Sequence, residues 1–239
     1  MADVTVTYNG QNILEMSATG RKTLKTAKKR CKTDIEVAYV KPGGGGGDVE
    51  PPLPAEYQRI EYLDFVPSIG IVVTIPSYDR MLFRARYMSR KNETKESCAF
   101  GYRQYSTEGT DFELGTRSAT QLLAYVRRNG FGFDDKEAYT LGSVVTSELV
   151  LKNPKTTALV GAYGHYSGST VANMALDGRF YWAQMVDLHD FSTVCWLVPC
   201  YRKADDQLGV YDHVAQAFFD ETYTQSSTTP SITAGPDVN

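Results

Sequence analysis

The chain has 239 residues, of which 42% are hydrophobic, and its formal net charge is −3 at pH 7. This length and composition are enough for one large domain with a core of its own and a smaller module beside it. A slightly acidic chain is not expected to be a general nucleic-acid binder, because such domains are usually basic as a whole.

Residues 1–40 are predicted to form a small β module. In "DVTVTYNG" the alternation of Val4, Val6 and Tyr8 with threonine indicates a strand, and Asn9–Gly10 predicts a hairpin turn. Alternation returns in "DIEVAYV". The N-terminus lacks the basic and then apolar pattern of a secretory signal, so we expect synthesis in the cytoplasm. A module of about forty residues is marginally stable alone, which favours an assembly that holds it.

Residues 41–54, "KPGGGGGDVEPPLP", are predicted to be a linker. Five consecutive glycines lose too much backbone entropy to hold a regular element, and the prolines after them favour extended chain. Charge also changes across this segment, since residues 1–47 carry eight Lys/Arg and four Asp/Glu, whereas the remainder carries seventeen and twenty-four. We therefore expect a basic module tethered to an acidic main domain at 55–239.

The main domain is predicted to be all-β. In "MLFRARYM" one face carries Met81, Phe83, Ala85 and Tyr87, and the other carries arginines. Further strand-length segments are separated by clusters of Gly, Asn, Asp and Ser; they are "IGIVVTI", "QLLAYVRR", "SELVLK", "TALVGAY", "TVANMALDGRFYWAQMVD" and "CWLVPCYR". Many short strands with turns between them favour a sandwich of the jelly-roll kind. No apolar run approaches the length of a membrane span.

The stretch "CYRKADDQLGVYDHV" raises the question of an active site, because it holds a cysteine, a histidine and three aspartates. Its pattern predicts a hairpin instead. Trp196, Val198 and Cys200 share one side of the first strand, and Leu208, Val210 and Val214 share one side of the second, opposite Tyr211 and His213. The Asp205–Asp206 pair suits the turn between them.

No catalytic or metal site is expected from these residues. Cys200 shares a face with apolar side chains, and no third group that would orient a Cys–His pair is evident. The three histidines, at 165, 189 and 213, have no metal-ligand spacing, and the four cysteines fit neither a zinc ribbon nor a redox pair. All four cysteines are expected to be buried thiols. A carboxylate pair for glycan hydrolysis stays open, since it needs only closeness in space.

The end of the chain resembles the concanavalin A-like (laminin-G-like) jelly-roll domains of tailed bacteriophages and prophages. The residues that fit their closing pattern are Val198, Pro199, Cys200, Arg202, Lys203, Gly209, Tyr211, Asp212, Val214, Phe218, Gly235 and Pro236. The opening "LPAEYQRIEYL" is also similar to theirs. Residues 1–40 resemble a second phage module, through Met16, Gly20, Lys22, Thr23, Leu24, Lys25, Thr26, Ala27, Cys31, Asp34 and Ile35.

This resemblance implies a virion structural protein, an appendage of the tail or baseplate that contacts the host surface and binds glycan there. It implies that residues 1–40 bind other virion proteins and that the chain assembles as a homo-oligomer, a trimer on a symmetric tail. No cofactor is expected. Two alternatives remain, a capsid fibre or head decoration protein and, in another class, a glycan hydrolase.

Two expected loops are the candidate glycan site. They are rich in Gly and Ser, and each combines tyrosines with a cation or an imidazole; the residues are Tyr102, Arg103, Tyr105, Tyr163, His165 and Tyr166. A tyrosine ring can stack on the C–H face of a sugar while its hydroxyl stays polar. The competing interpretation is that these rings pack over the edge of the sandwich. Trp182 and Trp196 lie inside expected strands, and we expect them in the core.

Overall fold

The structure is a computed structural model, and it describes most of the main domain and part of the N-terminal module. The described residues are 4–8, 11–16, 37–38, 50–66, 69–90, 97–102, 110–118, 120–128, 131–135, 138–154, 156–162, 164–165, 170–171, 175–224 and 231–238. They form strands, bridges, turns and bends without any helix, which confirms the all-β prediction. Consequently, the described part of the chain contains no helix of the length and apolarity that a membrane span needs.

The chain divides into two compact units, Met1–Pro51 and Pro52–Asn239. The first contains an antiparallel sheet of β2 (Gln11–Met16), β1 (Val4–Tyr8) and β3 (Val37–Ala38), with the β1–β2 hairpin where the sequence predicts one. The hairpin turn itself, most of the expected linker and residues 17–36 lie outside the described residues. We call the second unit the body.

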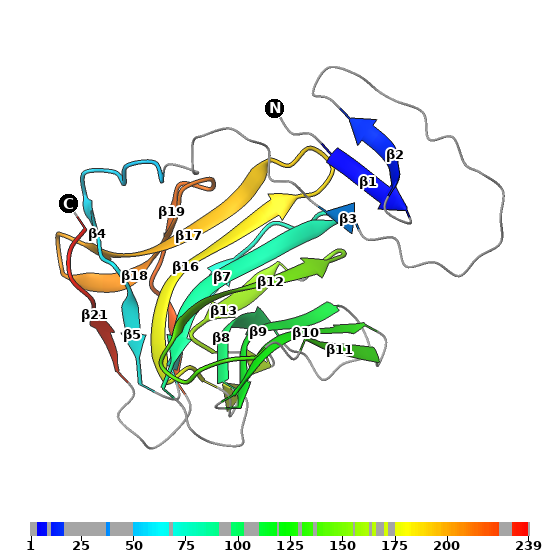
Figure 1. Ribbon diagram of the computed structural model, residues 1–239. Helices are drawn as coiled ribbons and strands as arrows, with labels where there is room; N and C mark the ends of the chain where they lie inside the picture. The colour runs from blue at the N-terminus through cyan, green and yellow to red at the C-terminus, as the bar shows by residue number, and fades with distance from the viewer. Residues whose placement is uncertain are drawn as a thin grey trace. The chain divides into compact units, whose positions relative to one another are not determined.

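The body has two principal antiparallel sheets (Figure 1). In spatial order, the seven-stranded sheet contains β11 (Phe131–Asp135), β10 (Gln121–Arg128), β9 (Thr110–Ser118), β8 (Ser97–Tyr102), β13 (Thr157–Val160), β6 (Ile69–Thr74) and β20 (Thr222–Thr224). The order of the main path through the nine-stranded sheet is β12 (Val144–Leu151), β7 (Met81–Ser89), β16 (Gly178–Asp187), β17 (Thr193–Arg202), β18 (Gln207–Asp212) and β19 (Ala217–Phe219).

Three short strands extend the nine-stranded sheet. β4 (Tyr57–Arg59) pairs with β17, while β5 (Leu63–Phe65) pairs with both β16 and β21 (Ile232–Ala234). Beyond β21, Ile60 bridges to Asp237, and the amide of Val238 donates to the carbonyl of Arg59 at 2.9 Å. Segments that are about 175 residues apart in the sequence therefore lie side by side at one border of the body.

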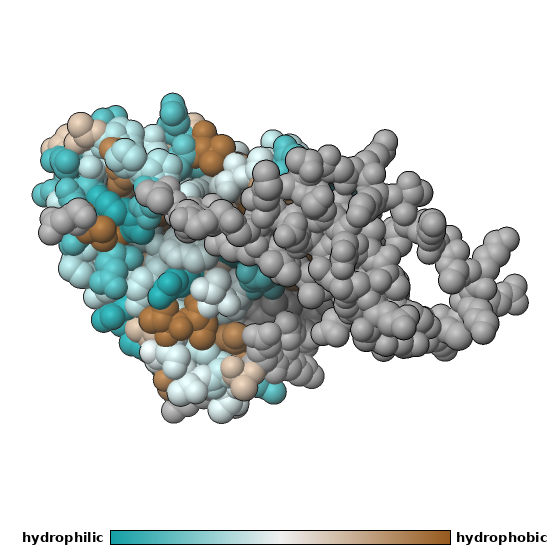
Figure 2. All heavy atoms as spheres, turned by 45° about the horizontal axis from the view of Figure 1, so that its top comes forward, coloured by the Kyte–Doolittle hydropathy of each residue, from teal (hydrophilic) through white to brown (hydrophobic). Residues whose placement is uncertain are grey.

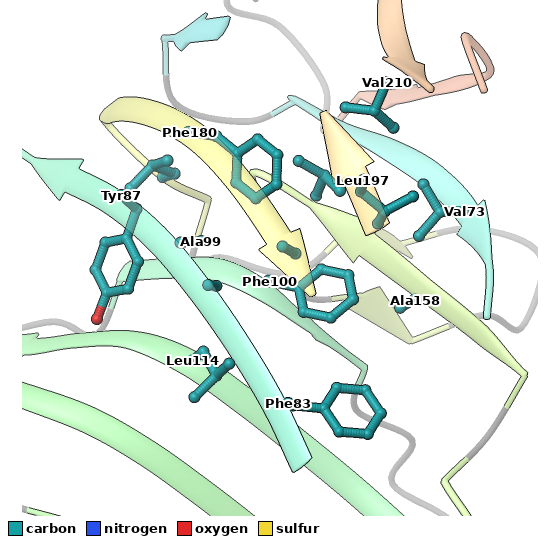
Figure 3. Close-up of a cluster of buried hydrophobic side chains, with 14 of the residues drawn as sticks. Val73, Phe83, Tyr87, Ala99, Phe100, Leu114, Ala158, Phe180, Leu197 and Val210 are labelled. Carbon is teal, nitrogen blue, oxygen red and sulfur yellow. The ribbon is translucent and has the colours of Figure 1, made fainter. Parts of the chain in front are cut away.

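The core lies between the two sheets. Figure 3 shows Phe83, Phe180 and Leu197 from the nine-stranded sheet clustered with Phe100 and Leu114 from the seven-stranded sheet, and all five are fully buried. The Phe83 and Phe112 rings, from opposite sheets, have centroids 4.9 Å apart. The alternation predicted for residues 81–87 is confirmed, since Met81, Phe83, Ala85 and Tyr87 are buried on the core side of β7.

One buried polar contact joins the two sheets. The Tyr87 hydroxyl donates to the carbonyl oxygen of Gly115 in β9 and lies 2.8 Å from the Ser147 hydroxyl of β12. Burial raises the pKa of Tyr87 well above its usual range. The phenol is therefore neutral under all ordinary conditions and keeps its proton for this hydrogen bond.

Candidate functional site

The loop tyrosines that the sequence favours are mostly outside the described residues. Arg103, Tyr105, Tyr163 and Tyr166 are among those outside, and of His165 only the backbone is described, in β14 (Gly164–His165), which pairs with β15 (Thr170–Val171). Tyr102 is described, and its predicted place in a loop is wrong. It is the last residue of β8 and is 6% exposed, because its side chain belongs to the core between the sheets.

The stretch "CYRKADDQLGVYDHV" forms the predicted hairpin. β17 and β18 pair antiparallel from Leu197↔Asp212 to Arg202↔Gln207, and residues 203–206 make the turn. The Asp205 carboxylate accepts a hydrogen bond from the Gln207 amide at 3.3 Å and binds the Arg202 guanidinium at 2.8 Å. The clustered charges thus stabilise the tip of a hairpin.

Cys200 and His213 lie too far apart to act as a nucleophile and its base. The amide of His213 donates to the carbonyl of Trp196, so the imidazole lies beside Trp196. Cys200 is four residues further along the same strand, about 13 Å away at the usual rise per residue. A general base must come within hydrogen-bond reach of its nucleophile, and this pair does not meet that condition.

Cys98, Cys195 and Cys200 are buried thiols, as expected, and Cys31 lies outside the described residues. Burial raises the pKa of the Cys195 thiol well above its usual range, and the neighbouring Asp212 carboxylate raises it further. A thiol that stays protonated is a poor nucleophile and a poor metal ligand. In the described residues, moreover, no group of three or more His, Cys, Asp and Glu side chains is placed to hold a metal ion.

We expect these buried thiols to resist modification in the folded protein. In a Cys31→Ser variant at about pH 8, a disulfide reagent should label no cysteine within minutes, and all three should react in denaturant. Because the pKa of Cys195 is raised in the folded protein, the thiol ionises in the unfolded chain first as pH rises. Ionisation then favours the unfolded chain. The free energy of unfolding that Cys195 contributes should therefore be constant below about pH 8 and fall above it. Rapid labelling of native Cys195, located by peptide mapping, would contradict the assigned burial.

A different set of residues forms the candidate site on the outer face of the nine-stranded sheet. We call it the tryptophan face, defined by Arg86 of β7, Trp182 and Gln184 of β16, Trp196 of β17 and His213. They lie in two adjacent rows across the sheet. In one row, Arg86 of β7 is opposite Trp182 of β16. In the other row, Gln184 of β16 is opposite Trp196 of β17, and the backbone amide of His213 donates to the carbonyl of Trp196. Both tryptophans are half-buried, so the expectation that they lie in the core is wrong.

A second, smaller cluster supports the two indoles. Val198, Cys200 and Tyr211 are buried on this outer face, and Trp182, Trp196, Tyr57, Phe218 and Leu53 pack against them. The ring centroids of Trp196 and His213 are 5.9 Å apart in an edge-on arrangement. Because the cluster fixes one side of each indole, the rings are held in place while part of their surface remains open to solvent.

Polar groups surround the indoles. Arg86 is exposed, its guanidinium carbon lies 5.9 Å from the centroid of Tyr181, and no carboxylate in the described part of the chain pairs with it. By contrast, Arg84 is paired with Glu148 at 2.7 Å, and Asp64 holds Arg90 and Arg179 at 2.5 and 3.3 Å. The Gln184 amide donates to the Thr193 hydroxyl at 3.3 Å. Arg86 is therefore the cation of this face that is available to a ligand.

Rigid aromatic rings with hydrogen-bonding groups around them suit a sugar. An indole can cover the apolar C–H face of a pyranose, and a guanidinium can bind its hydroxyl or carboxylate groups. Figure 2 shows that apolar residues on the visible face of the described part gather in separate patches among polar ones. Small apolar patches of this kind are normal on the surface of a folded domain, so the candidate site rests on the two indoles and their neighbours.

A signal for this face was present in the sequence. Trp196 alternates with Cys195 and Leu197, so strand parity places it opposite those two residues, and only the assumption that its side was the core side was wrong. For Trp182 parity fails, because a bulge between Phe180 and Trp182 reverses the faces.

Comparison of the chain with family models, curated proteins and solved structures finds no significant match.

Proposed function

We propose that this chain is a structural protein of a tailed-phage particle and that its body, a concanavalin A-like jelly roll, binds glycan on the host cell. The observation that carries the binding role is the pair of half-buried tryptophans on one sheet face, with Arg86 beside them. The resemblance of the closing segment to phage jelly-roll domains supports the proposal that the chain belongs to a phage particle. The division into two compact units supports the proposal that one unit anchors the other.

In this proposal residues 1–40 attach to other virion proteins and the body faces outward from the tail or baseplate. A shallow site of this kind binds a sugar weakly, near millimolar affinity, or about −4 kcal/mol. Several copies on one particle, as in the proposed trimer, raise the effective affinity by factors of about 10² to 10⁴. The assembled protein can therefore attach firmly to a cell although each site binds weakly.

The test compares binding of the full chain to host cells and to a panel of their polysaccharides. A Trp182→Ala/Trp196→Ala variant should lose about 2 kcal/mol per site, roughly thirtyfold, and multivalent attachment should disappear. Tyr78→Ala is the matched control, because Tyr78 is an exposed aromatic residue, 42% exposed, that belongs to none of these sites. A Tyr105→Ala/Tyr166→Ala variant tests the loops that the sequence favours.

The outcomes separate the alternatives. Attachment that survives loss of both tryptophans means that the indoles only cover the cluster beneath them. If the loop variant alone loses attachment, the ligand binds at the loops. If the wild-type protein binds no cell and no polysaccharide, the proposed glycan binding is wrong, and the alternative of a capsid fibre or head decoration protein is favoured. Release of reducing ends from any polysaccharide would instead point to a hydrolase.

A further inference from the structure

β12 is a long and regular edge strand. It pairs with β7 over eight consecutive residues, Val144↔Met88 to Leu151↔Met81, without a shift of register. It borders the nine-stranded sheet, and within the described residues no strand pairs with its other side (Figure 1). Every second residue of β12 thus directs its backbone N–H and C=O away from β7, which is the usual template for pairing with another chain.

The side chains of β12 do not protect this edge. Soluble proteins usually block an edge with charged side chains, proline or a bulge, and of these β12 has only Glu148, which is paired with Arg84 of the same chain. Its outward residues are instead Val144, Thr146, Glu148 and Val150, and the two valines are 43% and 52% exposed. Two of the exposed large apolar side chains of the described body therefore lie on one edge strand.

The outward residues are symmetric about Ser147. Val144 and Val150 lie three residues before and after it, and Thr146 and Glu148 lie one residue before and after it. In an antiparallel pair of β12 strands centred on Ser147, Val144 of one copy would lie opposite Val150 of the other copy, and Val150 opposite Val144. On the inner side, half-buried Val145 would lie opposite half-buried Leu149. A two-fold contact requires this kind of self-complementarity.

We propose that β12 pairs antiparallel with β12 of a second copy of this chain, about a two-fold axis at Ser147, so that the two sheets become continuous. Charge supports the same register. The only charged side chain of β12, Glu148, lies opposite Thr146 of the second copy, which keeps the two carboxylates apart, and Arg84 of its own chain already pairs with it at 2.7 Å. Cross-strand valine pairs stabilise such a contact, whereas opposed like charges destabilise it.

This contact is independent of the proposed glycan role and of the proposed trimer. It joins bodies in pairs, so it also applies to a protein with no ligand. A strand from an unrelated protein could use the same edge, but it would not explain the symmetry of the valines about Ser147. A second copy is therefore the occupant that these residues favour.

A charge-swap experiment tests the register in the full chain. Variant one carries Val144→Lys and Val150→Lys, and variant two carries Val144→Glu and Val150→Glu. Each alone opposes like charges at both valine pairs, so its two-fold association should weaken at least a hundredfold in sedimentation equilibrium. An equimolar mixture opposes Lys to Glu twice and should associate again as a heterodimer. Val66→Lys is the control, since Val66 is 42% exposed and lies outside β12.

A cysteine pair tests the same register in any oligomer. Oxidising a mixture of Val144→Cys and Val150→Cys chains should link residue 144 of one chain to residue 150 of the other, because directly opposed residues have Cβ atoms about 5 Å apart. Each variant alone should give no link at these positions. Wild-type protein that is monomeric, an association that survives the opposed charges, or cross-links in another register would each overturn the proposal.

Discussion

Asp212→Ala should lower the free energy of unfolding by about 3–5 kcal/mol. Asp212 is 1% exposed, and one of its carboxylate oxygens accepts hydrogen bonds from the amides of Trp196 at 3.0 Å and Val214 at 2.9 Å. A hydrogen bond to a charged group contributes about 1.5–3 kcal/mol, and alanine would leave both amides without this acceptor. In urea, the midpoint of unfolding should fall by about 1.5–2 M for a domain of this size.

Two variants isolate the cause. Asp212→Asn keeps an oxygen acceptor and should lose less than half as much as alanine. Asp79→Ala removes an exposed aspartate that pairs with Lys152 at 3.3 Å, and such surface pairs contribute less than about 1 kcal/mol. A loss below about 1 kcal/mol for Asp212→Ala would mean that water replaces the carboxylate. Because Asp212 also holds the Trp196 backbone and the turn that carries His213, the alanine variant should weaken glycan binding too.

Gly161→Ala should destabilise the body by about 2–5 kcal/mol. Gly161 has a φ of +78°, where a residue with a Cβ loses about 1–2 kcal/mol. Its Cβ would also lie 2.3 Å from the ring of Phe65, which is fully buried. Moving that ring requires repacking of the core, at a further cost of about 1–3 kcal/mol. Denaturant unfolding of the purified chain measures the sum.

Gly142 provides a matched control for the backbone term. It has a φ of +81°, and an added Cβ would meet nothing within 4 Å, so Gly142→Ala should lose only the first 1–2 kcal/mol. Phe65→Leu in the Gly161→Ala background should recover part of the loss, since the smaller side chain relieves the clash. Equal effects of the two glycine variants, or no coupling with Phe65, would contradict the assigned contact.

Strands with one charged face were predictable, and strands buried on both faces were not. β7 alternates arginine with apolar residues, so its core side could be identified from the sequence. All six residues of β8 are buried, which leaves no alternation, and the sequence gives β8 and β9 no signal that separates them from the loop expected around Tyr102. Burial on both sides of β17 equally concealed which of its faces meets the other sheet.

Local backbone geometry explains why the faces predicted for Val214 and Trp182 are wrong. Val214 was expected on the face of Leu208 and Val210, but β18 ends at Asp212, whose carboxylate turns the chain, and Val214 is 48% exposed in that turn. The bulge before Trp182 reverses the parity of β16 in the same way. Neither a side-chain cap nor an extra residue in a strand alters the hydrophobic pattern. The tryptophan face therefore became recognisable only from the pairing of the strands.

The bridge between Ile60 and Asp237 has a consequence for protein engineering. Residues bridged across antiparallel strands are only about 5 Å apart, so the chain just after β4 and the last described residues of the body lie side by side. A unit with this property can be inserted into a surface loop of another protein without forcing that loop open. It can also be circularly permuted, with a short peptide joining the old ends and a new start in the exposed turn at Ala204–Asp206. The body can therefore be transferred into another protein as a single insertion.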